Sequence, residues 1–213
     1  MAHIIVIGGH GKVALHLARI LSERGDKVSS VIRNPDHTDD VASAGAEPVT
    51  ADIENLDTDA LADVVAGNDA VVFAAGAGGG EAARTYAVDR DAAIRVIDAA
   101  AQAGVKRFVM VSYFGAGPDH GVPRDEPFFA YAEAKAAADA HLRGSDLDWT
   151  VLGPGQLTLE PGTGKIAVDA AKGSVSRADV AAVAAAVLAD DSTIRRTIEF
   201  NNGDVPITEA LAG

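Results

Sequence analysis

Three side chains in the second half of the sequence have the types and the spacing to move a proton. Tyr131 and Lys135, within the stretch YAEAK, stand four residues apart, so a helix would place them on one face. A lysine ammonium beside a phenol favours the phenolate, which lowers the tyrosine pKa and makes the residue a usable acid or base near neutral pH. Ser112 ends the apolar run VMVS, and its hydroxyl can polarise a carbonyl group. The three residues together predict acid–base catalysis, while Tyr-x-x-x-Lys by itself is also typical of a solvent-facing pair.

A glycine-rich segment near the N-terminus has the spacing of a phosphate-binding turn. Gly8, Gly9 and Gly11 lie between the β-branched run IIVI and an amphipathic helical pattern. In such a turn, backbone N–H groups and a helix N-terminus can approach a pyrophosphate. The spacing Gly8-x-x-Gly11-x-x-Ala14 provides glycines for the turn and the close approach, and a small residue where the helix packs on the strand. We therefore predict dinucleotide binding, with a purely structural turn as the alternative.

The dinucleotide would also contact the ends of the strands that follow. The candidate cofactor-binding residues are Gly8, Gly9, His10, Gly11, Lys12, Val13, Arg33, Asp52, Ile53, Ala74, Ala75, Gly76, Lys135 and Pro154. Arg33 ends the second apolar run, where an acidic residue suits the ribose 2′-hydroxyl of NAD and an arginine suits the 2′-phosphate of NADP. Lys12 would add positive charge to this site. We expect NADP as the cofactor, while Asp36 keeps NAD as the less favoured alternative.

Two further segments bear on the same site. Asp52 would contact the adenine or, equally, cap a helix. The small residues at 74–76 would let the cofactor ribose lie against the backbone. They lead into the glycine-rich stretch GAGGG at 76–80, which is either a flexible loop or a ligand-facing one.

The sequence contains no motif for a metal site, a P-loop or an α/β-hydrolase. There is no cysteine, and the six histidines show no H-E-x-x-H or similar ligand spacing, so we expect no metal. Both Gly-Lys pairs lack the residues of a P-loop, and no G-x-S-x-G motif of an α/β-hydrolase is present. The hypothesis of a nicotinamide-dependent site therefore has no strong competitor among these motifs.

Composition limits the partners. Hydrophobic residues make up 48% of the chain and charged residues 23%, as in ordinary globular proteins. The formal net charge of −13 repels nucleic acids and anionic membranes. No basic leader precedes the first apolar run, and no run is long enough to span a bilayer. We expect a cytoplasmic protein with a small-molecule substrate, and the sequence does not predict its oligomeric state.

Apolar runs and helical patterns alternate along the chain and predict the elements that position these residues. The predicted strands are HIIVIG, KVSSVI, AEPVTAD, DAVVFAA, KRFVMVS, LDWTVLGP and RRTIEFN, and the predicted helices span about 12–22, 37–44, 56–66, 82–103, 129–143 and 177–189. This alternation indicates an α/β fold with a doubly wound parallel sheet, strand order 3-2-1-4-5-6, an extra C-terminal strand and helices on both faces. We expect a single NAD(P)-binding Rossmann domain over 1–213, with a reduced substrate region at about 154–213. Within that region, 154–173 would hold a short strand or a lid.

The same segments resemble the short-chain dehydrogenase/reductase superfamily, and specifically its atypical NmrA-like or biliverdin-reductase-B-like NAD(P)-binding members. The resemblance rests on GGHGKVA, VIRNP, VVFAAGAGG, VDRDAAIRVIDAAAQAGVKRFVMVS, YAEAKAAADAHLRGSDLDWTVLGPGQLT and SRADVAAVAAAVL. It implies an NADP-linked reductase in which Tyr131 donates or takes the proton. Lys135 would lower the pKa of Tyr131 and hold the nicotinamide ribose, and Ser112 would orient the substrate carbonyl.

The sequence also departs from this family pattern. Asp89 stands where the family has an asparagine that organises a proton relay, and Gly153 stands where arginine is common. The segment between Ser112 and Tyr131 is longer than in compact members.

Three functions remain open at this point. The leading hypothesis is an NADP-dependent oxidoreductase that transfers hydride to a small carbonyl, quinone or flavin-like acceptor. The alternatives are a non-catalytic NADP(H)-binding regulatory protein and an NAD-dependent epimerase/dehydratase-like enzyme. The last is less favoured because little chain follows the sixth strand to enclose a nucleotide sugar.

Overall fold

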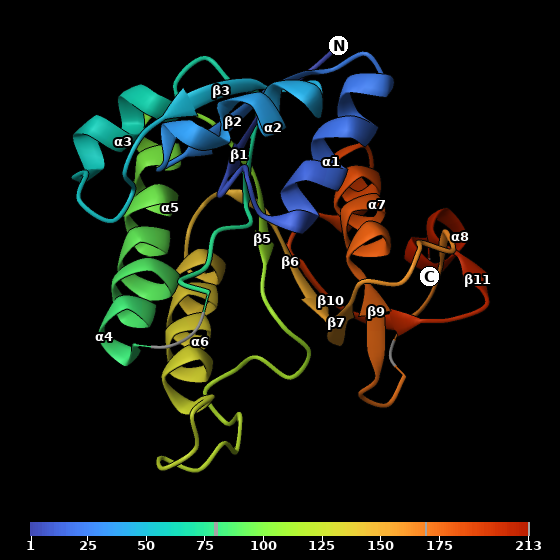
Figure 1. The fold of residues 1–213 in the computed structure, drawn as a ribbon. Coiled ribbons are helices and arrows are strands. Elements are labelled where there is room, and N and C mark those ends of the chain that lie inside the picture. The colour runs from blue at the N-terminus through green and yellow to red at the C-terminus, as the bar shows by residue number, and fades with distance from the viewer. Residues whose placement is uncertain (79–80, 169, 213) are drawn as a thin grey trace.

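A large, mostly parallel β-sheet forms the centre of the computed structural model, which describes residues 1–78, 81–168 and 170–212 (Figure 1). Within these residues the sheet has nine strands in the order β11-β8-β10-β6-β5-β4-β1-β2-β3. Their bounds are β1 His3–Ile7, β2 Lys27–Ile32, β3 Glu47–Thr50, β4 Ala70–Phe73, β5 Arg107–Val111, β6 Asp148–Pro154, β8 Lys165–Val168, β10 Arg196–Asn202 and β11 Val205–Pro206. The order from β3 to β6 confirms the predicted 3-2-1-4-5-6 arrangement.

The C-terminal strands extend this sheet beyond β6. Strand β10 pairs in parallel with β6, which confirms the extra C-terminal strand. Strands β8 and β11 are antiparallel additions at the edge. A separate parallel pair is formed by β7 (Gln156–Thr158) and β9 (Ser174–Ser176). The stretch 154–173, which we expected to hold a strand or a lid, therefore contributes short strands to both sheets.

Helices cover both faces of the sheet, as predicted. Helices α1 (Lys12–Glu23) and α7 (Arg177–Leu188) pack on one face, and α3 (Thr58–Val65), α5 (Ala93–Gln102) and α6 (Phe129–Arg143) on the other (Figure 1). The shorter helices are α2 (Thr38–Ser43), α4 (Ala82–Thr85) and α8 (Ile207–Leu211), with single turns η1 (Pro35–His37) and η3 (Asp191–Thr193).

The alternation of side chains along β1 explains why two cores form. Ile4 and Val6 belong to the core under α1 and α7, whereas Ile5 and Ile7 belong to the core under α3 and α5. Successive side chains of a strand point to opposite faces, so a strand covered on both sides is apolar at every position. All four side chains are at most 1% exposed. Each fully buried side chain of this size contributes about 1.5–3 kcal/mol relative to an exposed one.

The long fourth helix is not a regular α-helix. Between α4 and α5 the chain forms a π-helical segment, η2 (Tyr86–Ala92). The wider i→i+5 turn changes which side chains face inward, and such segments are frequent at functional sites. It places Asp89 in the interior, only 1% exposed. None of the helices in the described residues has the length and apolar character needed to cross a bilayer.

Candidate cofactor pocket and active site

The glycine-rich turn between β1 and α1 packs tightly against neighbouring strand ends. Gly8 has a φ of 86°, and a Cβ atom there would lie 2.5 Å from the Ala75 Cα. A Cβ atom at Gly9 would lie 2.5 Å from the Ser30 Cβ. Both approaches are closer than real Cβ atoms make, so these two glycines are required by packing as well as by the predicted cofactor contact.

The N-terminus of α1 offers unpaired backbone donors beside this turn. The first hydrogen bond of the helix runs from the Leu15 N–H to the Gly11 carbonyl at 2.9 Å. The amides of Lys12, Val13 and Ala14 precede it and therefore have no acceptor within the helix. Gly11 provides no side-chain cap, and the first turn carries no acidic residue. These features suit the negatively charged diphosphate of a dinucleotide.

A cavity of about 300 Å³ opens at the carboxyl ends of β1 to β4. Its predicted lining residues are Gly8, His10, Gly11, Arg33, Asp52, Ile53, Ala74, Ala75 and Gly76. Sequence reasoning missed Asn34, His37, Glu54, Arg84 and Val88, which also line it. Residues 34 and 54 adjoin predicted ones, so the strand-end rule could have found them, whereas no spacing pointed to residues 37, 84 and 88.

Arg33 lies in this cavity opposite an acidic residue. Its Nη1 is 3.4 Å from the Glu54 Oε2, and the Arg84 Nε lies 3.5 Å from the same oxygen. One carboxylate is therefore shared by two guanidinium groups. Arg33 is the most exposed of the three side chains, at 55%.

Other predicted residues of this region have side-chain partners of their own. The His10 and His37 rings stack with centroids 3.5 Å apart, and the His10 Nε2 lies 2.8 Å from the Asp40 Oδ2. The Asp52 carboxylate accepts hydrogen bonds from the Glu54 N–H and the Asn55 side-chain amide. Asp52 thus lines the cavity but uses its carboxylate to fix the turn after β3, and the helix cap that we considered for it is supplied by Asp57 at the start of α3.

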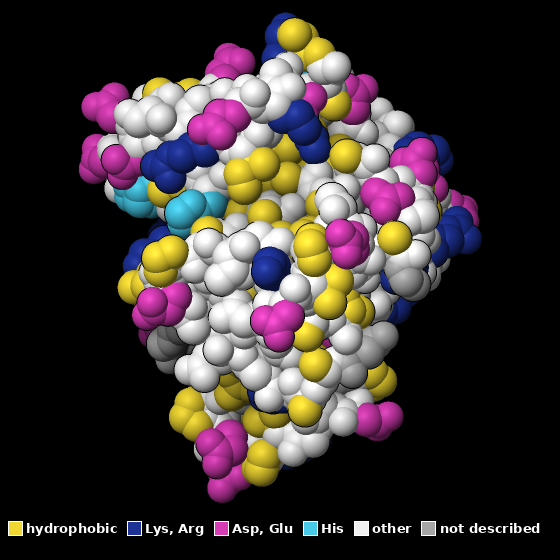
Figure 2. Space-filling view, turned by 90° about the vertical axis from the view of Figure 1, so that its right-hand side faces the viewer, with side chains coloured by type: hydrophobic (Ala, Val, Ile, Leu, Met, Phe, Trp, Pro, Cys, Tyr) yellow, Lys and Arg dark blue, Asp and Glu magenta, His cyan; other side chains and the backbone are white. Residues whose placement is uncertain are grey.

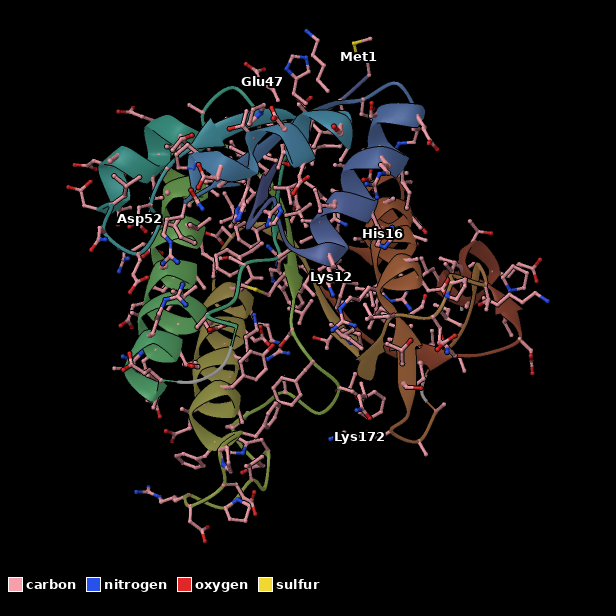
Figure 3. All side chains as sticks on the ribbon, in the orientation of Figure 1. Met1, Lys12, His16, Glu47, Asp52 and Lys172 are labelled. Carbon is pink, nitrogen blue, oxygen red and sulfur yellow. The ribbon has the colours of Figure 1, made fainter. Side chains whose placement is uncertain are left out.

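Lys12 does not lie in the cavity of Arg33, contrary to our expectation of a shared positive site. It lines a smaller depression between α1 and α7, together with His16, Arg19 and Arg177. Figure 3 shows Lys12 at the start of α1, with Asp52 on the side of α3. The face that carries α1, α7 and α8 intersperses basic and acidic side chains (Figure 2). The predicted residues Gly9, Val13 and Lys135 line neither the cavity of Arg33 nor this depression, and Pro154 lines a further cavity that contains Ser112.

A second cavity, of about 440 Å³, contains the Ser112 and Tyr131 side chains. Its walls are largely aromatic and apolar: Tyr113, Phe114, Phe128, Pro154 and Leu157. The Tyr131 ring lies 5.6 Å from the Tyr113 ring and 5.2 Å from the Phe128 ring, centroid to centroid. Lys172 is the one cationic side chain among the described residues that line this cavity, and Figure 3 shows it below β7 and β9. Ser112 and Tyr131 are therefore brought together, as predicted.

Lys135 occupies the predicted helical face but does not bond to Tyr131. It is 1% exposed, and its Nζ donates to the Met110 Sδ at 3.2 Å and lies 5.7 Å from the Phe73 ring centre. Burial lowers the pKa of Lys135, while the Asp139 and Asp89 carboxylates oppose this shift.

The pKa of Tyr131 is raised, and not lowered as we expected. Burial is the largest cause, and the negative charges of Asp89 and Asp139 add to it. The expectation considered only the charge of Lys135 and left out both carboxylates, Asp139 two turns further along α6 and Asp89 in the π-helical segment η2. The phenol is therefore held in its protonated form.

Asp139 is a buried residue of the site that sequence reasoning missed. It is 0% exposed, and the Ser112 Oγ donates to its Oδ2 at 2.6 Å. Its other oxygen, Oδ1, has no hydrogen-bond partner among the described residues. Burial raises the pKa of Asp139, opposed by Lys135 and by the Ser112 hydrogen bond. Asp139 follows Lys135 by four residues on α6, so the spacing that singled out Tyr131 and Lys135 would have found it.

Asp89 is a second buried carboxyl group close to Lys135. Its Oδ2 accepts a hydrogen bond from the Ala77 N–H at 3.0 Å, and its Oδ1 is unpaired among the described residues. Burial raises its pKa, opposed first by that backbone bond and then by Lys135. The π-helical segment thus adds a carboxylate where the resembled family has an amide.

The doubly wound sheet and the cavity beside the uncapped α1 define a Rossmann-type nucleotide-binding protein. The chain belongs to the NAD(P)H-binding family, which matches residues 8–191. It is 36% identical to the uncharacterized sugar epimerase YhfK of Bacillus subtilis, over 98% of both chains.

Solved structures agree with this assignment. A putative NAD-dependent epimerase/dehydratase from Bacillus halodurans has a TM-score of 0.92 at 35% identity, covering 100% of this chain and 99% of that one. The oxidoreductase ylbE from Lactococcus lactis has a TM-score of 0.88 at 29% identity, covering 99% and 95%. The predicted relationship to NAD(P)-binding proteins is confirmed. These relatives include both epimerase-like and oxidoreductase names.

Proposed function

We propose that this protein is an NADP-dependent reductase that transfers hydride to a small carbonyl, quinone or flavin-like acceptor. The observation that carries the proposal is the second cavity, in which the Ser112 and Tyr131 side chains lie among aromatic walls at the carboxyl edge of the sheet. The Ser112 and Tyr131 hydroxyl groups, in a largely apolar pocket that Tyr113 also lines, suit the binding of one polar atom on a flat, apolar acceptor.

The first cavity supports the cofactor part of the proposal. The amides at the start of α1 would bind the diphosphate, and Arg33 and Arg84 would bind the 2′-phosphate that distinguishes NADP from NAD. The nicotinamide, when bound, supplies the hydride. We keep NAD as the less favoured cofactor.

The chain's own residues would orient the acceptor and manage its proton. Ser112 and Tyr131 would hold the substrate oxygen, and Tyr113 and Phe128 would exclude water from it. Lys135 is 1% exposed and lines neither cavity, so it would hold the nicotinamide ribose only after its Nζ turned from the Met110 Sδ toward the cofactor. Residues from the C-terminal part, including Gln156, also line the cavity, which supports a substrate region within 154–213 of a single domain.

An epimerase or dehydratase reaction is the second candidate, because two of the relatives carry such names. A cavity of about 440 Å³ with one lining cation favours a small acceptor over a nucleotide sugar with its charged diphosphate. A non-catalytic NADP(H)-binding regulator would need neither hydroxyl.

Binding and turnover assays distinguish these functions. We expect NADPH to quench the intrinsic fluorescence of the protein and raise its Tm more than NADH does at equal concentration. We then expect NADPH oxidation, followed by absorbance, with at least one member of a panel of carbonyl compounds, quinones and flavins. Conversion of a nucleotide sugar without net NADPH oxidation would instead identify an epimerase or dehydratase. Binding without any turnover would favour the regulator, and no effect of either nucleotide would refute the cofactor assignment.

A further inference from the structure

The interior beside the second cavity holds more acidic than basic groups. Asp89 and Asp139 are 1% and 0% exposed, and Lys135, which interacts electrostatically with both, is 1% exposed. Arg84 and Arg143 also act on these carboxylates, but from partly exposed positions where solvent screens their charge. An unbalanced charge is costly in a buried site. One additional proton on a carboxylate would make the buried group of three neutral.

The hydrogen bonds indicate which carboxylate holds this proton. Asp89 accepts from the Ala77 backbone N–H, which can only donate and therefore favours the ionised form. Asp139 is paired with the Ser112 hydroxyl, which can either donate or accept. A protonated Asp139 can reverse this bond and donate to the Ser112 oxygen. The bond then frees the Ser112 proton to point into the second cavity.

This reversal matters because a hydroxyl has only one proton. While Ser112 donates to an ionised Asp139, it has no proton left for a substrate oxygen. The predicted role of Ser112 toward a carbonyl is therefore available only when Asp139 is protonated. Tyr113 and Tyr131 also interact electrostatically with Asp139. The negative charge of an ionised Asp139 raises the pKa of both phenols.

We propose that Asp139 is a positioning residue that holds a proton in the resting protein and passes it through Ser112 to the acceptor. This inference rests on the proposed reductase function. When the carbonyl carbon accepts hydride, the C=O π electrons move to the oxygen, which bonds to the Ser112 proton. The Ser112 oxygen takes the proton of Asp139 at the same time. Asp139 is left as a carboxylate, and the buried Lys135 ammonium balances its new charge.

The resting proton can be tested without cofactor or acceptor. Infrared spectroscopy detects the C=O stretch of a protonated carboxyl group, and ¹³C-aspartate labelling assigns it to Asp residues. We expect this band in the unliganded protein at neutral pH and its loss in Asp139→Asn. Asp89→Asn removes the second buried carboxylate and leaves Asp139 and Lys135 balanced without the extra proton, so the band should weaken or disappear there too, and the response of the band to Ser112→Ala identifies which carboxyl group carries it. A band that persists in Asp139→Asn, or no such band in the wild type, would overturn the proposal.

A second variant, Ser112→Ala, tests the proposal if Asp139→Asn does not fold. Ser112→Ala removes the hydrogen-bond partner but leaves Asp139 in place. We expect the carboxyl band to remain and to shift to higher frequency, as it does when such a group loses an acceptor. An unchanged frequency would show that Asp139 does not donate to Ser112.

Kinetics then separate positioning from a structural role. Asp139→Asn should reduce turnover with a carbonyl acceptor by about 10²-fold, the lower range for general acid catalysis, and should leave NADPH affinity unchanged. Asp98→Asn, which removes an exposed acidic side chain of α5, is the matched control and should not change turnover. A wild-type rate in folded Asp139→Asn would refute the relay. If no acceptor is reduced but the infrared band is assigned to Asp139, the proposed reductase function is refuted, whereas the proposal that Asp139 holds a proton is supported.

Discussion

The Arg33 guanidinium and the Glu54 carboxylate face each other across the first cavity, with Nη1 and Oε2 3.4 Å apart. Arg84 approaches the same carboxylate from α4. Glu54 thus occupies the two arginines that would bind a 2′-phosphate, and a bound phosphate must compete with it. The preference for NADP over NAD is then set by three side chains and not by Arg33 alone.

Replacing Glu54 with Gln should strengthen NADPH binding more than NADH binding. The change removes both the competitor for Arg33 and the repulsion of the phosphate. Exposed ion pairs are worth about 0.2–1 kcal/mol, so we expect a gain of up to roughly fivefold in NADPH affinity by fluorescence titration. Glu47→Gln, at the amino end of β3, changes the net charge equally and should have no effect. Equal gains for both nucleotides would contradict a contact with the 2′-phosphate.

Arg33→Ala should have the opposite effect. Loss of a hydrogen bond to a charged group costs about 1.5–3 kcal/mol, which predicts at least a tenfold weaker NADPH complex and little change for NADH. Arg19→Ala, which removes an exposed arginine of α1 that does not line the first cavity, serves as the control in the same calorimetric titration. If the affinities for NADPH and NADH fall equally, Arg33 does not contact the 2′-phosphate.

Tyr131→Phe should separate a reductase from a regulator. We expect turnover to fall by about 10²-fold while the NADPH affinity is retained, because the hydroxyl acts on the acceptor. Since burial and two carboxylates raise the pKa of Tyr131, its phenol stays protonated through the neutral range. The loss should therefore be the same from mildly acidic to mildly alkaline pH. Unchanged turnover would show that this hydroxyl is not needed.

Asp139 should make the stability of the protein depend on pH. Its pKa is raised in the folded state, so above the ordinary aspartate pKa of about 3.9 the unfolded chain releases this proton while the folded protein keeps it. The free energy of unfolding should then fall by about 1.4 kcal/mol per pH unit until the folded pKa is reached. Urea denaturation at several pH values should show this decline in the wild type relative to Asp139→Asn. A constant difference between the two would contradict the raised pKa.

Gly9→Ala should lower the free energy of unfolding, because it adds a methyl group to a tightly packed turn. The added methyl group would lie 2.5 Å from the Ser30 Cβ at the back of the turn. Overpacking of this kind costs about 1–3 kcal/mol, which urea denaturation can measure. Gly117→Ala is the control, because an added Cβ there would meet no atom within 4 Å. Equal stability of the two variants would show that the turn can relax.

The sequence by itself determined the order of the elements and the place of the glycine turn. These depend on local properties, namely the period of apolar residues and the backbone freedom of glycine at residues 8 and 9. Ser112 was also predictable at the edge of the sheet where the parallel strands end, and Tyr131 lies near it because α6, which follows β5 in the chain, begins beside the same edge.

Only the tertiary structure decided how the charges of the site are arranged. Asp139 and Ser112 form a hydrogen bond although they lie 27 residues apart in the sequence. Glu54, which follows β3, forms an ion pair with Arg84 of α4. The Lys135 ammonium turns toward Met110 and away from the predicted phenol. Each of these contacts depends on how a helix packs on the sheet and on which groups are thereby shielded from water. Burial and long-range pairing set the protonation of these groups, and neither is encoded in the spacing of neighbouring residues.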